Sequence, residues 1–287
     1  MFDSFFTKGI LFLLSLFSEK KYQNGFEMST NYLSSLFGLD GKVLLLTGAG
    51  GFLVGEMSRA AGRAGMKVVC CDVRLEDAKR TAEEVIAAGG NAIACQLDVR
   101  EPKAFDAALD AALQAFGRLD CVLNGAGTNA PTPFFEISVE EWNNILAVQL
   151  TGTMLSCQVF GKYLVDQGKG SIVNISSASA GPPLSKAFTY SVAKAGVKNL
   201  TQNLAREWGT VGVRVNALRP GFFPTEWSMK NFITPEREAS ILGHTAMKRY
   251  GRPEELVGAV LWLFSDAAGF VTGAEIAVDG GFTAMTI

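Results

Sequence analysis

Three polar residues in the second half of the chain have types and a spacing that suit proton transfer. Tyr190 and Lys194 are four positions apart, so on a helix both side chains share one face. Ser177 precedes them, directly after an apolar run that is typical of a strand. A neighbouring ammonium lowers the pKa of a tyrosine, whose reference value of about 10 makes it a weak base at neutral pH. We expect Tyr190 to take an alcohol proton while Ser177 hydrogen-bonds the developing carbonyl oxygen.

A glycine-rich turn has the composition of a phosphate-binding loop. It follows a predicted strand and precedes a predicted helix, so backbone N–H groups at the helix start face an incoming pyrophosphate. Asp72 ends the next strand, where a carboxylate accepts hydrogen bonds from both adenosine ribose hydroxyls and repels a 2′-phosphate. The pattern predicts a site for NAD in preference to NADP, formed by Gly48, Gly50, Gly51, Phe52, Leu53 and Asp72.

Two more charged residues lie near the carboxyl ends of these strands. Arg74 is interpreted as a solvated loop residue, although a cation beside Asp72 complicates the preference for NAD. Asp98 follows the third predicted strand. It is placed to meet the adenine amino group, to cap a helix before Pro102, or to do both.

The surrounding elements alternate as in a parallel sheet covered by helices on both faces. This favours one Rossmann-like, doubly wound α/β domain with a seven-stranded sheet. Residues 222–250 form the least regular stretch and are the candidate lid. The predicted strands are 43–47, 67–72, 92–96, 121–124, 171–176, 214–218 and 275–278, and the predicted helices are 53–64, 75–88, 102–116, 139–165, 187–208 and 253–264.

Composition excludes several function classes. The net charge of −2 and the lack of a basic run argue against nucleic acid as a partner. The five cysteines are odd in number and contain no C-x-x-C pair, so we expect reduced thiols. His244 is the single histidine, which argues against a histidine-based metal site.

The first 27 residues differ from the remainder of the chain. Residues 9–17 are apolar, but a membrane-spanning helix needs about 20 such residues. We expect 1–27 to be an extension outside the fold and 28–287 to be the folded domain of a cytoplasmic protein, with weak membrane-surface anchoring as the alternative.

Taken together, these motifs resemble the short-chain dehydrogenase/reductase family over residues 39–282. The similar segments include Thr47-Gly48, Asp98-Val99, Asn124-Gly125-Ala126-Gly127, Ser177, Tyr190 with Lys194, and Pro220-Gly221 with Thr225. The resemblance implies that Asn124, Ala126 and Gly127 shape the cofactor pocket beside the central strand, that Val99 also contacts the cofactor, and that Lys194 also holds the nicotinamide ribose. It also implies that the backbone at Phe223 and the side chain of Thr225 fix the nicotinamide carboxamide, with Pro220 among the cofactor-binding residues. Helices 139–165 and 187–208 resemble those that pair family members into a homodimer or homotetramer.

Two positions depart from the family pattern. Phe52 and Val54 occupy positions where the family usually has glycine. Gln149 stands where the family typically has an asparagine that supports a water molecule and the lysine. Its longer amide either serves the proton relay from a shifted position or impairs the relay.

Local segments are most similar to reductases of sugar acids, such as the mannonate/fructuronate pair, and to gluconate and polyol dehydrogenases, which places the chain in carbohydrate metabolism. A carboxylated, hydroxyl-rich substrate then needs polar side chains over the nicotinamide. Arg219 is the sharpest candidate, because the position before Pro220 is commonly small in the family and an arginine there can pair with a carboxylate. The alternative is that Arg219 points to solvent. The candidates are Thr128, Asn129, Arg219, Trp227 and His244.

Three alternatives stay open. In the first alternative the chain is a 3-oxoacyl thioester reductase, although Asp72 argues against the NADPH that such enzymes usually use. In the second alternative the chain is a dinucleotide-binding sensor or scaffold that has lost catalytic turnover, as Gln149 would permit. Alternatively, Tyr190 and Lys194 lie on the exposed face of an amphipathic helix and do no chemistry.

Overall fold

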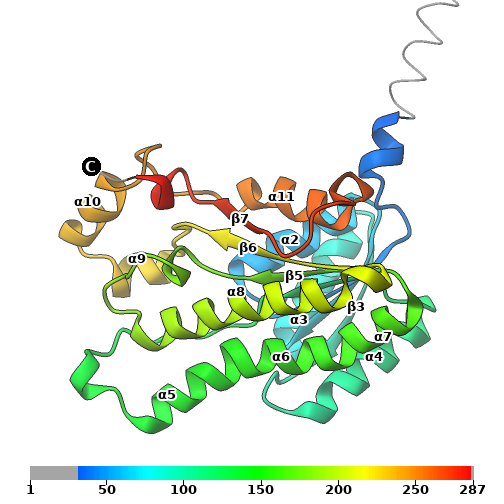
Figure 1. Ribbon diagram of the computed structural model, residues 1–287, viewed down its shortest axis with the longest axis horizontal. Coiled ribbons are helices and arrows are strands. Elements are labelled where there is room, and N and C mark those ends of the chain that lie inside the picture. Colours follow the sequence, from blue (N-terminus) through cyan, green and yellow to red (C-terminus); the bar gives the residue numbers. More distant parts are fainter. Residues whose placement is uncertain (1–31, 286–287) are drawn as a thin grey trace, which may run out of the picture.

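A parallel β-sheet with strand order β3-β2-β1-β4-β5-β6-β7 forms the centre of the molecule (Figure 1). The computed structural model describes residues 32–285. The strand order reverses between β1 and β4, as in other doubly wound sheets, so the predicted fold class is confirmed. The strands are β1 (Val43–Thr47), β2 (Lys67–Asp72), β3 (Asn91–Gln96), β4 (Cys121–Asn124), β5 (Gly170–Ile175), β6 (Val213–Pro220) and β7 (Glu275–Val278).

Helices cover both faces of the sheet because alternate strand residues point to opposite sides. Leu44 and Leu46 of β1 share one buried core with Val260, whereas Val43 and Leu45 share another with Phe105. In Figure 1, α2 and α11 lie on one side of the sheet and α8 on the other. The covering helices are α2 (Phe52–Arg63), α3 (Leu75–Ala87), α4 (Pro102–Phe116), α8 (Phe188–Trp208) and α11 (Glu254–Phe264).

The predicted helix 139–165 is longer and less uniform than expected. It consists of α5 (Val139–Leu146), α6 (Gly152–Ser156) and α7 (Lys162–Gln167), joined by π-helical turns at Ala147–Thr151 and Cys157–Gly161. A π turn adds a residue to the helical turn and is frequent at functional sites. The first of these turns contains Gln149.

The stretch predicted as an irregular lid contains two helices, α9 (Glu226–Phe232) and α10 (Pro235–Gly243). Thr225 Oγ1 accepts the N–H of Ser228 at 3.0 Å and Thr234 Oγ1 accepts the N–H of Arg237 at 3.3 Å. Each threonine therefore caps a short helix that has little hydrophobic periodicity of its own. The caps were the sequence signal for these helices.

The predictions for residues 1–27, and the predicted domain start at 28, lie outside the described residues. Within 32–285, no helix is both long and apolar enough to cross a membrane. The same residues contain no group of three or more His, Cys, Asp or Glu side chains able to hold a metal ion.

A chain of buried polar side chains connects the two central strands to the helices beneath them. Ser156 Oγ donates to Asn124 Oδ1 at 2.5 Å, and Asn124 Nδ2 donates to Asn174 Oδ1 at 2.9 Å. Asn174 Nδ2 then donates to Thr201 Oγ1 at 2.9 Å. All four side chains are buried, so each depends on its neighbour to satisfy its hydrogen bonds. This network fixes α8 against the end of β5.

Removing the central amide should therefore destabilise the fold. Asn174→Ala leaves Asn124 Nδ2 and Thr201 Oγ1 without that partner, and we expect it to lower the free energy of unfolding by about 2–4 kcal/mol. Asn203→Ala, at an exposed position of α8, should change it by less than about 0.5 kcal/mol. Denaturant unfolding of both variants measures the difference. Equal values would show that the network does not stabilise the fold.

Candidate active site

The structure brings Ser177, Tyr190 and Lys194 together at the carboxyl end of β5. Tyr190 and Lys194 lie in the first two turns of α8, and the hydroxyl groups of Ser177 and Tyr190 hydrogen-bond each other. Lys194 Nζ donates to the backbone oxygen of Ile175 at 2.6 Å and lies 5.6 Å from the centroid of the Tyr190 ring. Ser177 Oγ accepts the N–H of Ser179 at 3.2 Å, which fixes the serine side chain. The alternative of an exposed Tyr190 and Lys194 is wrong, because Lys194 is only 4% exposed.

Burial governs the protonation of this group. It lowers the pKa of Lys194 from 10.5 to about 7. Burial also raises the pKa of Tyr190 above 10.0, and the hydrogen bond with Ser177 only partly opposes that rise. The lowering of the Tyr190 pKa by the Lys194 ammonium stays a prediction for the chain with an oxidised dinucleotide bound, because the positively charged nicotinamide ring is expected to act together with the lysine.

A single cleft of about 660 Å³ joins this group to the predicted cofactor residues. Asp72 and Asp98 lie along one part of its wall, and Tyr190 and Lys194 along another. The predicted residues that line it are Gly48, Gly51, Phe52, Leu53, Asp72, Asp98, Val99, Ala126, Gly127, Thr128, Asn129, Gln149, Tyr190, Lys194, Phe223 and Thr225. One elongated ligand can thus contact both sets of residues.

The glycine-rich turn packs tightly against the end of β4. A Cβ at Gly48, whose φ is 75°, would lie 2.8 Å from Cα of Ala126. Thr47 Oγ1 accepts the N–H groups of Gly125 at 3.2 Å and of Ala126 at 3.3 Å. The following helix, α2, has neither a side-chain cap nor an acidic residue in its first turn. Its N–H groups therefore suit an anion.

The two departures in the turn have different environments. Phe52 is about half exposed at the rim of the cleft, whereas Val54 is buried. A Cβ at Gly125 would lie 2.5 Å from Cγ2 of Val54, so the valine fills the space beside that glycine. The turn consequently keeps a close contact between α2 and the end of β4 without the usual glycine.

Asp72 is held at the end of β2 by backbone donors. Its Oδ2 accepts the N–H of Gly50 at 3.0 Å, and its Oδ1 accepts the N–H of Arg74 at 3.1 Å. Each oxygen keeps a second lone pair for a ligand hydroxyl. Asp72 is only 8% exposed, which limits competition from water.

Asp98 pairs with Arg100, whose guanidinium lies 2.6 Å from Oδ2 and lowers the pKa of the carboxyl. Asp98 does not cap the next helix, because the cap position of α4 is Glu101 and has no side-chain hydrogen bond. The capping interpretation of Asp98 is therefore wrong. Its position in the cleft wall leaves the adenine interpretation as a prediction.

Gln149 points its amide at the loop after β4. Its Nε2 donates to the backbone oxygen of Thr128 at 2.6 Å, and a Cβ at Gly127 would lie 2.8 Å from the same nitrogen. Within the described residues its buried Oε1 has no hydrogen-bond partner. The longer arm thus supports the Thr128 loop and leaves an acceptor in the cleft wall.

Several other predicted residues support the cleft from behind. Gly50 lies beside Asp72, Asn124 belongs to the buried network, and Pro220 ends β6 next to Val278 of β7. Ser177 reaches the site through its contact with Tyr190. Gly50, Asn124 and Pro220 thus position residues that line the cleft, whereas Ser177 adjoins the hydroxyl of Tyr190.

The predicted substrate residues separate into groups. Thr128 and Asn129 line the cleft, whereas Arg219 pairs with Glu275 of β7, next to Ser176. The Arg219 guanidinium thus already has a carboxylate partner. The backbone of Trp227 is in α9, but its side chain lies outside the described residues.

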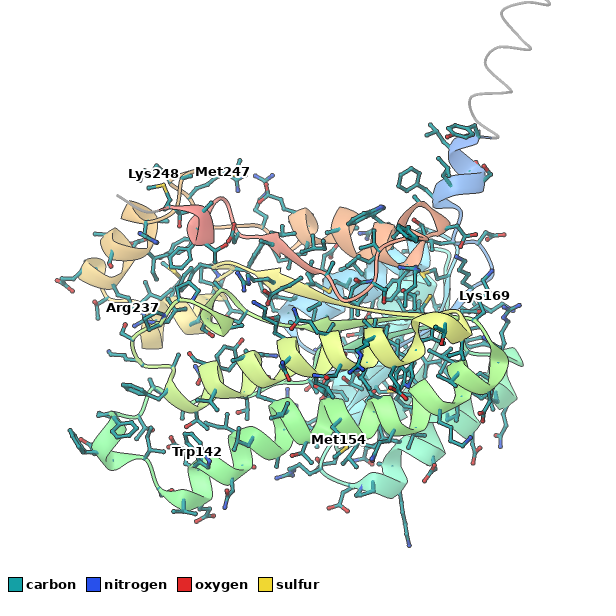
Figure 2. The ribbon with its side chains drawn as sticks, viewed as in Figure 1. Trp142, Met154, Lys169, Arg237, Met247 and Lys248 are labelled. Atoms are coloured by element: carbon teal, nitrogen blue, oxygen red, sulfur yellow. The ribbon has the colours of Figure 1, made fainter. Side chains whose placement is uncertain are left out.

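His244 packs edge-on against Phe282, with ring centroids 5.0 Å apart, beside a second cleft of about 460 Å³. Arg237, labelled in Figure 2, lines the same cleft and donates to Ser185 Oγ at 2.7 Å. His244 therefore lines the second cleft and not the larger one that holds Tyr190 and Lys194.

Some contributors to the site were not evident from the sequence motifs, among them Ile175 and Ser228. The backbone oxygen of Ile175 holds Lys194, and Ser228 lines the cleft beside Thr225. The side chain of Ile175 gives no indication of this role, because Lys194 contacts only the backbone carbonyl. Ser228 was detectable from the Thr225 cap that begins α9.

A family model described as enoyl-(acyl carrier protein) reductase matches residues 55–283. The chain is 38% identical to the short chain dehydrogenase/reductase astE of Aspergillus oryzae, covering 86% of this chain and 97% of that protein. It is 35% identical to D-threitol dehydrogenase of Mycolicibacterium smegmatis, covering 86% and 95%.

Solved structures agree with these relatives. A putative D-mannonate oxidoreductase from Haemophilus influenza with bound NAD has a TM-score of 0.81 and 33% identity, covering 87% of this chain and 97% of that one. A gluconate 5-dehydrogenase from Burkholderia cenocepacia in complex with NADP and tartrate has a TM-score of 0.84 and 29% identity, covering 88% and 99%. By its sequence, its fold and the residues around its cleft, the chain belongs to the short-chain dehydrogenase/reductase family.

Proposed function

We propose that this chain is an NAD-dependent dehydrogenase that transfers hydride between nicotinamide and a secondary alcohol carbon of a sugar acid or polyol. The observation that carries the proposal is the single cleft that holds Asp72 in one part of its wall and Tyr190 with Lys194 in another. A dinucleotide is long enough to contact both parts of this wall at once. The uncapped start of α2 between them suits its pyrophosphate.

In this proposal Tyr190 is the acid and base. In alcohol oxidation its phenolate takes the hydroxyl proton, while Ser177 donates a hydrogen bond to the same oxygen as it becomes a carbonyl. In ketone reduction Tyr190 returns the proton. Lys194, held by Ile175, places its ammonium beside the phenol and favours the phenolate. When bound, an oxidised nicotinamide dinucleotide supplies the hydride acceptor and one further positive charge.

The preference for NAD over NADP rests on Asp72. Its carboxylate faces the cleft, and a 2′-phosphate beside it would place two anions together. One structural relative holds NAD and another holds NADP, so the relatives support a nicotinamide dinucleotide without selecting one. The position and burial of Asp72 in this chain favour NAD.

A polyhydroxylated substrate is supported by polar residues that line the same cleft as Tyr190. Thr128 and Asn129 line the cleft, and Ser228 joins them from α9. The names of similar proteins include a D-threitol dehydrogenase, a gluconate 5-dehydrogenase and a putative D-mannonate oxidoreductase. We infer a substrate alcohol with several hydroxyl groups. Arg219 pairs with Glu275 and is therefore not the partner of a substrate carboxylate in this proposal.

A second candidate is a dinucleotide-binding sensor with little turnover. The amide of Gln149 is directed at Thr128, so a relay through that position differs from the one expected in the family. The hydrogen-bonded Ser177, Tyr190 and Lys194 group favours the enzyme, because a sensor does not require it.

We also propose a cytoplasmic homodimer or homotetramer. Large apolar side chains are exposed around the start of α5 and α8, including Phe135 at 99%, Val139 at 76% and Val192 at 49%. Such a group of exposed apolar residues suits burial against a second copy. Light scattering should give a multiple of the 30.7 kDa chain mass, and a monomeric mass would contradict the proposal.

Tyr190→Phe separates enzyme from sensor. It keeps the ring but removes the acid–base hydroxyl, so we expect kcat to fall by about 10²–10⁴-fold while the affinity for NADH changes by less than about threefold. Tyr163→Phe, on α7, is the matched control and should retain turnover. Steady-state kinetics and NADH fluorescence titration supply the two measurements. Unchanged turnover in Tyr190→Phe would contradict the proposed role.

Burial of Lys194 predicts a pH dependence of stability. Between about pH 7 and pH 10 the unfolded chain keeps a proton on Lys194 that the folded chain has released. Stability from this group therefore rises with pH through the window, by at most about 1.4 kcal/mol per pH unit. Relative to wild type, Lys194→Met should be most stabilising near pH 7 and lose that advantage toward pH 10. Denaturant unfolding without added dinucleotide tests this, and a pH-independent difference would contradict it.

A further inference from the structure

The first turn of α3 holds a carboxylate between two arginines. Asp77 forms ion pairs with both Arg74 and Arg80. The guanidinium groups of Arg74 and Arg80 lower the pKa of Asp77, which stays charged. Asp77 is largely covered, at 16% side-chain exposure, whereas Arg74 and Arg80 are mostly exposed. The carboxylate therefore holds both guanidinium groups in place.

This cluster lies directly against the glycine-rich turn and Asp72. A Cβ at Gly50 would lie 2.4 Å from Cβ of Asp77 and 3.0 Å from Oδ2 of Asp72. Arg80 Nη2 donates to the backbone oxygen of Gly50 at 3.1 Å. The N–H of Arg74 donates to Asp72 Oδ1 at 3.1 Å, and Arg74 lines the cleft beside Asp72. Arg74 thus lies in the cleft wall beside Asp72, and Arg80 contacts the glycine-rich turn next to it.

Given the proposed function, the ribose 2′ position of the dinucleotide lies beside Asp72. We propose that Asp77 is a positioning residue that enforces the preference for NAD by engaging Arg74 and Arg80, so that neither guanidinium is available to a 2′-phosphate.

The charges explain why Asp72 needs this support. An arginine near a phosphate binds it through paired, charge-assisted hydrogen bonds. With Asp77 in place, the carboxylates of Asp72 and Asp77 balance the charges of Arg74 and Arg80. Without Asp77 the cluster has one uncompensated positive charge, and Arg74 can turn toward the cleft that it already lines. NADP then gains a partner that NAD does not use.

The test compares two charge-neutralising substitutions in the same helical turn. Asp77→Asn removes the carboxylate that engages Arg74 and Arg80. Glu76→Gln, the matched control, removes one that pairs with Lys79 and is highly exposed. Fluorescence titration with NADH and NADPH measures binding without turnover. We expect Asp77→Asn to tighten NADPH binding by about tenfold and to change NADH binding by less than about threefold, with both affinities nearly unchanged in Glu76→Gln.

Two further variants keep the inference falsifiable. Adding Arg74→Ala and Arg80→Ala to Asp77→Asn should abolish the gain in NADPH affinity. In the otherwise unchanged chain, the same two arginine substitutions should leave NADPH affinity within about threefold, because Asp77 already engages both side chains. This second result does not depend on the folding of Asp77→Asn.

The inference is overturned if Asp77→Asn leaves NADPH affinity unchanged. It is also overturned if Glu76→Gln produces an equal gain, or if the arginine substitutions alone weaken NADPH binding by about tenfold or more. Failure of the unchanged chain to bind either NADH or NADPH would contradict the proposed function itself.

Discussion

The site depends on a lysine that is buried at the end of a strand. Lys194 Nζ donates to the backbone oxygen of Ile175, and this contact joins α8 to β5 where Ser177 follows. A charged ammonium is costly to bury, which is why burial lowers its pKa to about 7. In the proposed mechanism this free-energy cost is offset by function, because the buried ammonium favours the phenolate of Tyr190. Behind this contact, Asn174 and Thr201 hold the same strand and helix together.

The sheet brings the other half of the site to this lysine. Because all seven strands are parallel, their carboxyl ends lie at one edge, and the order reverses between β1 and β4. Thr47 connects the ends of these two strands through the N–H groups of Gly125 and Ala126. Asp72 and Tyr190, far apart in the chain, consequently line one cleft. The residue proposed to recognise the ribose, Asp72, and the residue proposed to transfer the proton, Tyr190, are thus both held at the carboxyl edge of the sheet.

Much of this arrangement could be predicted from sequence because it follows from local rules. Alternating apolar runs and helical patterns gave the seven strands, and the spacing of Tyr190 and Lys194 gave a shared helical face. What could not be predicted depends on contacts between distant segments. Arg219 was predicted to pair with a substrate carboxylate, but it pairs with Glu275 of β7, which is far away in the sequence. Burial raises the pKa of Tyr190, and residue spacing gives no information about burial. The capped helices α9 and α10 were too short for periodicity to reveal.

The central claim is hydride transfer between NAD and a polyhydroxylated alcohol at Tyr190. It is tested most directly by following nicotinamide absorbance with NAD and NADP in parallel against sugar acids, polyols and simple secondary alcohols. Our account predicts turnover with NAD that is confined to polyhydroxylated substrates. Faster turnover with NADP would contradict the role given to Asp72. NADH binding without turnover of any substrate would contradict the enzyme and favour the sensor.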